Sequence, residues 1–277
     1  ETENDLTVKA NKRTFIFSKK DGQLKGVSVD NRKISFANGP RFIGARRADR
    51  SLDQFYNHDD EKAKEKDRTY SEFPDAAVFT KLDVKEDGGN LVVTANYKLG
   101  NLDKAQWTIN PSGDLALDYT YNFSGVVDLM GIRFDYPEDQ VISKRWLGAG
   151  PYRVWQNRIH GTQYDVWEND YNDPIPGETF TYPEFKGYFG NVSWMNIQTK
   201  EGTISLTNET PDAYIGVYQP RDGRDRLLYT LPESGISVLN VIPPVRNKVN
   251  STDLCGPSSQ PKWVNGPQTG RVIFRFM

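Results

Sequence analysis

The sequence contains very little cysteine, histidine or methionine: one, two and three residues among 277. The single cysteine, Cys255, excludes an intrachain disulfide and any metal site built from several cysteines. The two histidines, His58 and His160, are about a hundred residues apart, without the close spacing of a zinc motif. We therefore predict no cofactor and no metal site.

Long apolar runs and a strong net charge are also absent. No segment approaches the roughly 18 apolar residues of a membrane-spanning helix, and no signal peptide pattern is present. With 35 basic and 37 acidic residues the net charge is −2, which does not indicate a nucleic-acid partner. The chain opens on the polar segment Glu1–Asp5 without a methionine, so we expect a mature or excised fragment.

Aromatic residues are plentiful, at 12% of the chain, and they favour β structure and flat binding surfaces. Short runs of β-forming residues alternate with Gly, Pro, Asn and Asp turns. The expected strands lie at 6–9, 14–17, 24–29, 77–84, 90–99, 105–109, 114–123, 202–206, 213–218, 235–241 and 271–276.

No segment has the pattern of a long amphipathic helix, and no Gly/Ser-rich linker divides the chain. The strongly charged run at residues 59–68 is typical of a solvated surface element. These patterns predict an all-β protein, a large two-sheet antiparallel sandwich in which residues 1–277 form a single domain.

The segment Trp146–Arg158 combines a rigid turn with aromatic and basic residues. The run Gly148–Pro151 cannot be the interior of a helix, because proline disfavours the helical conformation of the residue before it. Aromatic rings beside guanidinium groups suit a sugar, which has an apolar C–H face and a rim of hydroxyls. The alternative is an aromatic-packed turn with a purely structural role. The side chains concerned are Trp146, Tyr152, Trp155, Arg145, Arg153 and Arg158.

Four segments in order resemble one known family. The segment 148–158 resembles the Gly-x-Gly-Pro signature of the C-terminal, small-chain domain of family-two glycoside hydrolases, the β-galactosidase family. Residues 182–194 resemble the two elements that follow this signature, and residues 38–49 resemble a stretch about a hundred residues before it. Residues 254–263 stand in place of the family's final Trp-containing element. The resemblance covers roughly residues 5 to 276.

This resemblance implies a galactose-mutarotase-like supersandwich. It also implies that the catalytic residues lie in another domain. Retaining glycosidases need two carboxylates about 5 Å apart. In the family these glutamates come from a (β/α)₈ barrel of around 250 residues, for which this chain has no room. We therefore expect no catalytic residue here, but a non-catalytic domain of a larger β-linked-glycoside hydrolase that packs on the barrel and contributes to its sugar-binding rim. Bacterial relatives of this kind suggest a periplasmic or secreted location.

The resemblance also singles out site residues. Trp263 corresponds to a tryptophan that forms an apolar wall for the sugar ring, although a buried Trp near the closing strand is the alternative. Arg158 and Glu184 are expected to pair and to join two signature loops. Arg153 replaces a glutamate of the family pattern, which also allows an acidic sugar as substrate.

Two other functions remain open at this stage. The first is an autonomous carbohydrate-binding module that uses Trp155 and Trp263. The second is an aldose 1-epimerase-like enzyme, in which His160 or His58 acts as general acid and a glutamate acts as base. The candidate bases are Glu168, Glu184 and Glu209.

Overall fold

Strands and short turns make up the described chain. The computed structural model describes residues 2–47, 70–171, 187–217, 231–244 and 256–277. Within these ranges the only helices are two short 3-10 turns, η1 (Glu138–Gln140) and η4 (Pro257–Ser259). Neither has the length or the apolarity to cross a membrane. The charged run 59–68 and the residues His58, Glu184 and Cys255 lie outside the described ranges.

The strands alternate along the chain with tight turns. They are β1 (Asp5–Ala10), β2 (Arg13–Ser18), β3 (Leu24–Val29), β4 (Arg32–Ile34), β5 (Ala37–Arg47), β6 (Tyr70–Glu72), β7 (Val78–Asp87), β8 (Asn90–Lys98), β9 (Leu102–Ile109), β10 (Leu115–Val127), β11 (Leu129–Asp135), β12 (Val141–Gly150), β13 (Gln163–Asp170), β14 (Trp194–Thr199), β15 (Gly202–Asn208), β16 (Tyr214–Val217), β17 (Ile236–Val241) and β18 (Lys262–Phe276).

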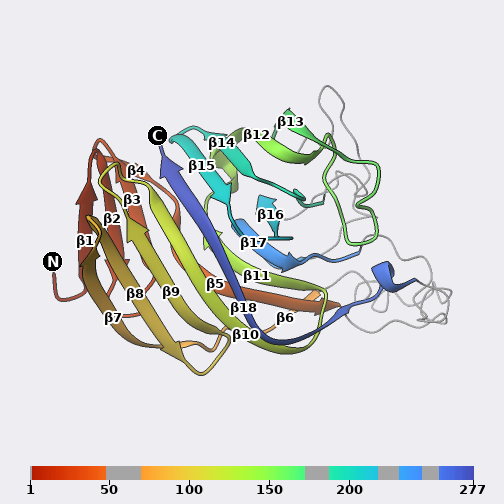
Figure 1. Ribbon diagram of the computed structural model, residues 1–277, viewed down its shortest axis with the longest axis horizontal. Helices are drawn as coiled ribbons and strands as arrows, with labels where there is room; N and C mark the ends of the chain where they lie inside the picture. Colours follow the sequence, from red (N-terminus) through yellow and green to blue (C-terminus); the bar gives the residue numbers. More distant parts are fainter. Residues whose placement is uncertain (1, 48–69, 172–186, 218–230, 245–255) are drawn as a thin grey trace.

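These strands form two nine-stranded sheets. The first sheet has the order β1-β2-β3-β5-β11-β17-β16, with β4 paired to β3 and β6 to β5. The second has the order β13-β12-β14-β15-β18-β10-β9-β8-β7. Neighbouring strands are antiparallel, and Figure 1 shows β18 crossing the second sheet beside β10. The predicted all-β antiparallel sandwich is confirmed.

The main core lies between the two sheets and is rich in aromatic rings. Phe36 stacks on Phe134 with ring centroids 4.8 Å apart and contacts Phe274 at 5.0 Å. Phe274 belongs to β18 of the second sheet, so these rings join the two layers. Burying each such side chain contributes roughly 1.5 to 3 kcal/mol, which makes this core the chief source of stability.

A second, smaller core covers the outer face of the first sheet. Successive side chains of a strand point to opposite faces, and on β5 Phe42 joins the main core while Ile43 joins the second. The outer cluster also draws residues from β6, β11, β17 and four segments outside the strands. Its buried members are Ile43, Ala45, Tyr70, Leu129, Val154, Trp155, Tyr188, Leu231, Leu239 and Ile242. The segment 148–158, singled out by the sequence, thus lies against this face.

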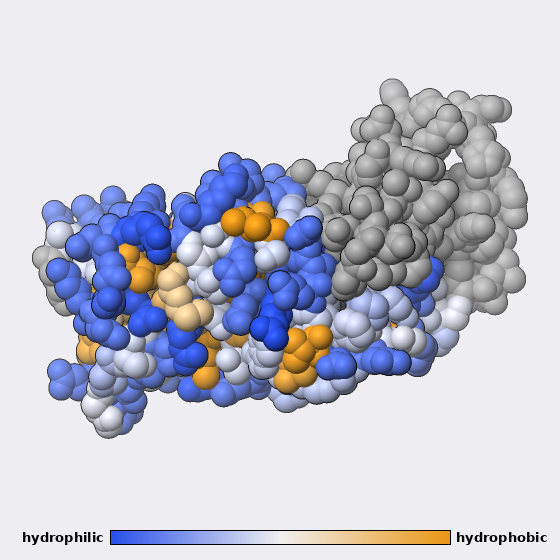
Figure 2. Space-filling model, turned by 90° about the horizontal axis from the view of Figure 1, so that it is seen from above, coloured by the Kyte–Doolittle hydropathy of each residue, from blue (hydrophilic) through white to orange (hydrophobic). Residues whose placement is uncertain are grey.

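The surface is mainly polar. On the face shown in Figure 2, hydrophobic residues form small separate patches among hydrophilic ones. Isolated apolar side chains are normal on soluble proteins and carry no functional meaning by themselves. The exposed large hydrophobic residues of the described ranges are Val78, Val84, Leu99, Ile142, Ile159, Tyr164, Val166, Trp263 and Met277.

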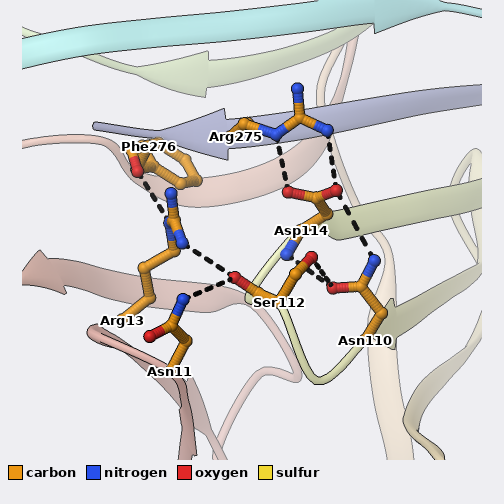
Figure 3. A network of polar contacts seen from close by, with 7 residues as sticks. All are labelled: Asn11, Arg13, Asn110, Ser112, Asp114, Arg275 and Phe276. Carbon is orange, nitrogen blue, oxygen red and sulfur yellow. Dashed lines mark hydrogen bonds and ion pairs between the residues drawn. The ribbon is translucent and has the colours of Figure 1, made fainter.

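A polar network joins the two sheets at one end (Figure 3). Arg13 on β2 donates from Nε to the carbonyl of Phe276 at 2.7 Å and from Nη1 to the carbonyl of Ser112 at 2.8 Å. Beside it, Arg275 on β18 makes two 2.7 Å hydrogen bonds to the two carboxylate oxygens of Asp114. This two-point geometry is among the stronger ion-pair arrangements.

We expect Asp114 to make stability depend on pH. The hydrogen bonds from Arg275 lower the pKa of the Asp114 carboxyl. Its contribution is therefore present above the unfolded-state pKa of about 3.9, and it is lost as the pH falls through the lower native pKa. Urea unfolding should show Asp114→Asn less stable than the parent by at most about 1 kcal/mol at pH 6, with a smaller difference near pH 2.

The control is Asp83→Asn, which removes an ion pair with Lys81 whose two side chains are both more than half exposed. Such pairs contribute little, so this variant should differ from the parent by no more than a few tenths of a kcal/mol at either pH. An Asp114→Asn difference that stayed constant from pH 6 to pH 2 would contradict the assigned role of the carboxylate.

Candidate functional site

The candidate site begins where strand β12 ends. The strand runs to Gly150, and a cis peptide bond joins Gly150 to Pro151. A Cβ on Gly150 would lie 2.4 Å from the ring of Trp167 on β13. Only glycine fits there, because real Cβ contacts are never that short. The glycine therefore lets β12 and β13 remain paired while the chain turns away.

The turn itself, residues 150–158, is held by backbone hydrogen bonds to a neighbouring loop. Val154 and Tyr188 exchange two of them, with N···O distances of 2.7 and 2.8 Å. Trp155 and Arg158 exchange another two across the tip of the turn. A Cβ on Gly187 would lie 2.0 Å from the Val154 carbonyl oxygen, so glycine is needed for this close approach.

Trp155 packs inside the outer core. The indole is 1% exposed and meets the Tyr188 ring at a centroid distance of 5.7 Å and an interplanar angle of 85°. Burial raises the pKa of the Tyr188 phenol well above its ordinary value. A sugar would reach the Trp155 ring only if these neighbours moved, so the structure gives Trp155 a packing role. Its contact with a sugar stays a prediction.

Gln156 connects the turn to the segment that precedes β18. Its backbone N–H donates to the Pro243 carbonyl at 3.1 Å, just beyond β17. Its side-chain Nε2 donates to the carbonyl oxygens of Ser258 at 2.9 Å and Gln260 at 2.6 Å. Because both partners are acceptors, the amide nitrogen must face them. Gln156 is 7% exposed, so these bonds lie away from water.

Trp263 follows Gln260 by three residues and is 72% exposed. It lies near the start of β18, opposite Val126 of β10. The sequence left open whether this tryptophan is exposed or buried near the closing strand, and in the structure it is exposed. An exposed indole offers an apolar face and a polar N–H, which suits stacking against a sugar.

The other predicted site residues are dispersed around the turn. Arg153 is 3% exposed, with its guanidinium 5.8 Å from the centre of the Phe189 ring. Arg158 and His160 are exposed, and the His160 carbonyl accepts a hydrogen bond from Tyr152 at 3.1 Å. Glu184 lies outside the described residues, so its pairing with Arg158 stays a prediction.

The residues of the epimerase hypothesis lie on different elements. Glu168 is exposed on β13, and Glu209 follows β15 and forms a 3.0 Å ion pair with Arg271. Within the described ranges, no hydrogen bond or ion pair joins the His160 imidazole to a carboxylate. The same ranges contain no group of three His, Cys, Asp or Glu residues able to hold a metal ion.

Sequence reasoning missed Gln156. The residue is uncharged and lies between two residues that were singled out, and its partners are a hundred residues away in sequence. Only its position inside the Trp146–Arg158 segment pointed to it.

The fold and the turn together define a large antiparallel β-sandwich in which two of the four Gly-Pro bonds, at residues 39–40 and 150–151, are cis. The model of the β-galactosidase small chain family matches residues 9–247. The chain belongs to this family, which confirms the resemblance found in the sequence. No curated protein matches the chain.

Several solved structures have a similar fold at low sequence identity. The galactose 1-epimerase of Lactobacillus acidophilus NCFM aligns over 99% of this chain and 94% of its own, with a TM-score of 0.49 and 9% identity. An aldose epimerase homologue from C. elegans aligns over 99% and 98%, with a TM-score of 0.44 and 7% identity. The α-N-acetylgalactosaminidase NagBb of Bifidobacterium bifidum aligns over 98% of this chain and 36% of its own, with a TM-score of 0.42 and 10% identity.

Proposed function

We propose that residues 1–277 are one accessory domain of a larger retaining β-glycosidase. In this proposal the bond-cleaving carboxylates belong to a (β/α)₈ barrel elsewhere in the same polypeptide. The present domain packs on the barrel and contributes Trp263 to the rim of its sugar site. Membership of the β-galactosidase small chain family supports the existence of such a parent.

The observation that carries the proposal is the exposure of Trp263. Most aromatic residues of the described ranges are buried, as in any core, yet this indole is 72% exposed. The segment before it is nevertheless fixed, because Gln156 binds two of its carbonyl groups. An exposed ring on a fixed segment is what a stacking platform requires, since little ordering is left to occur on binding.

A non-catalytic role agrees with the state of the carboxylates near the turn. Glu209 forms an ion pair with Arg271, which also pairs with Asp118, and Glu168 lies on the edge strand of the second sheet. A retaining mechanism requires two carboxyl groups about 5 Å apart, one of them held protonated. Strands β12 and β14 lie between β13, which carries Glu168, and β15, which precedes Glu209. At about 4.8 Å per strand this separation is too wide for such a pair.

The test compares this chain with the polypeptide encoded by its complete gene, on nitrophenyl β-glycosides of several sugars. The isolated chain should show no hydrolysis above buffer, while the complete polypeptide should be active. In the latter, Trp263→Ala should raise KM roughly two- to tenfold, because ring stacking contributes about 0.5 to 1.5 kcal/mol.

Two variants serve as controls in the complete polypeptide. Trp263→Phe retains an aromatic face and should recover most of the lost affinity. Val84→Ala alters another exposed hydrophobic residue, on β7 at the far edge of the second sheet, and should leave KM unchanged. Hydrolysis by the isolated chain, or a KM that does not respond to Trp263→Ala, would overturn the proposal. Glycan binding by the isolated chain that is lost on Trp263→Ala would favour an autonomous binding module instead.

A further inference from the structure

A cavity of about 590 Å³ lies at the end of the first sheet remote from the turn. Small-molecule sites usually measure about 300 to 1,000 Å³, so its size suits a small ligand. Its walls are the start of β5, the end of β11 with the residues that follow, and the segment before β17. The lining residues used below are Asn38, Arg41, Arg133, Asp135, Tyr136 and Glu233.

The cavity and the turn are far apart because they occupy opposite ends of the same strands. On β11, Asp135 pairs with Ala37 at the cavity end, and Leu129 pairs with Ala45 at the other. Six residues of extended chain separate the two ends, which is about 20 Å. Trp263 lies at the Leu129 end, since its partner Val126 is the second-last residue of β10, next to the β10–β11 connection. The cavity is therefore not part of the proposed rim.

Two arginines stand side by side on the cavity wall. Arg41 and Arg133 are cross-strand partners, so both project from the same face of the first sheet. In each of them the Nε–H is buried and has no acceptor among the residues that the structure describes. The two side chains are nevertheless 27% and 18% exposed, so a ligand in the cavity can contact the part of each that remains open.

The remaining groups on the wall are mainly acceptors. The Asp135 carboxylate receives hydrogen bonds from Arg41 and from the Asn38 amide, and these bonds fix its orientation. Arg133 is fixed in turn by Glu72 and by the Glu233 carbonyl. The Glu233 carboxylate itself is exposed and has no hydrogen-bond or ion-pair partner among the described residues. The Tyr136 hydroxyl donates to Glu201 at 2.9 Å behind the wall.

The charge balance decides which ligand class fits. Three carboxylates (Asp135, Glu138 and Glu233) and two guanidinium groups line the cavity, and Glu72 adds a further negative charge beside Arg133. This acidic excess disfavours an anion, although the arginines alone would suit one. The arginines equally disfavour an organic cation, and no metal-binding group of three exists in the described ranges.

A neutral ligand with several hydroxyl groups can form hydrogen bonds with both the carboxylates and the guanidinium groups of this wall. Each hydroxyl both donates to a carboxylate and accepts from a guanidinium N–H. We propose that the cavity formed by Arg41, Arg133, Asp135 and Glu233 is a second carbohydrate site, which binds a neutral sugar residue such as the end of a glycan chain. The site is independent of Trp263 and of the catalytic barrel.

Binding is tested on the purified 277-residue chain by calorimetry and by amide NMR. The probes are the neutral sugars galactose, glucose, mannose and xylose, with glucuronate and inorganic phosphate as anionic counterparts. At least one neutral sugar should bind at millimolar concentration and shift the amide resonances of Asn38 and Gly235, which both line the cavity. The anions should bind at least tenfold more weakly.

Asp135→Asn replaces the central carboxylate by an amide of the same shape and should weaken sugar binding at least tenfold. Glu233→Gln, at an exposed residue without a structural partner, should weaken it several-fold and keeps the test valid if Asp135→Asn does not fold. The matched control is Asp118→Asn, which breaks a comparable half-exposed ion pair with Arg271 on the second sheet and should bind within twofold of the parent.

Trp263→Ala separates this proposal from the proposed function, because sugar binding in the cavity should stay within twofold of the parent. The proposal is overturned if none of the four neutral sugars shifts the cavity resonances. It is equally overturned if glucuronate or phosphate binds more tightly than the neutral sugars. A third contrary result is that Trp263→Ala abolishes sugar binding while Asp135→Asn leaves it intact.

Discussion

Trp155→Ala should destabilise the protein by about 3 to 5 kcal/mol, the usual range for removing a buried tryptophan. The indole is 1% exposed, and its removal leaves a cavity among Tyr188, Val154 and the outer face of the first sheet. Backbone pairing on both sides of the turn limits how far the neighbours can collapse into that cavity. Urea unfolding followed by tryptophan fluorescence and circular dichroism measures the change.

Trp263→Ala is the matched comparison, because the same substitution is made at an exposed site. Its effect on the free energy of unfolding should stay within about 0.5 kcal/mol, as for most surface substitutions. Trp155 would then contribute to stability, and Trp263 to sugar contact. A Trp155→Ala variant as stable as the parent would show that the turn does not pack as described.

Gly187→Ala should destabilise the protein by about 2 to 4 kcal/mol, through steric overlap rather than through a lost contact. The added Cβ would lie 2.0 Å from the Val154 carbonyl oxygen, a backbone atom that cannot rotate away. The two hydrogen bonds between Val154 and Tyr188 must lengthen or break to relieve the overlap. Thermal and urea unfolding both measure the effect, and hydrogen exchange at Val154 and Tyr188 localises it.

Gly26→Ala is the control for this substitution. Gly26 lies inside β3, and a Cβ there meets no atom within 4 Å. Alanine should be neutral or should stabilise the strand by about 0.5 to 1 kcal/mol, because glycine loses more conformational freedom on folding. Equal effects of the two substitutions would refute the steric explanation for Gly187.

Local patterns were sufficient for most of the strands. Alternating residues predicted β3 at 24–29 with its observed bounds, and β8 and β17 to within one residue of theirs. Some of these strands have one buried and one solvent-exposed face, and others are short continuous apolar segments in the core. Turn residues mark the ends of both kinds. Pattern alone therefore identified the class of fold.

The strands around the turn could not be predicted in this way. β12 ends in Gly-Ala-Gly, a sequence that lowers strand propensity, and the reason for both glycines is tertiary. A Cβ on Gly148 would lie 3.0 Å from the Asn191 carbonyl oxygen, and one on Gly150 would strike Trp167. Likewise β18 begins nine residues before the expected strand, because its first half contains Gly266, Pro267 and Gly270.

The candidate site was only partly accessible from the sequence. The order of motifs, rather than local chemistry, pointed to Trp263, since nothing in its immediate neighbours indicates exposure. Aromatic and basic composition drew attention to Trp155 and Arg153, which the structure buries. The cavity of the first sheet was not foreseen, because its walls come from three segments about a hundred residues apart in sequence.

The position of β18 has a consequence for how the protein is made. The strand lies in the interior of the second sheet, between β15 and β10, yet it comes last in the described chain. During synthesis β10 emerges about 135 residues earlier, which at 5 to 20 residues per second is a delay of roughly 7 to 27 s. The edge of β10 lacks its β18 partner throughout that interval, and the edge of β15 lacks it for the last 54 residues, from Asn208 to Lys262. Such unpaired strand edges invite association with other chains. Ribosome-associated chaperones would have their greatest effect on yield in that interval.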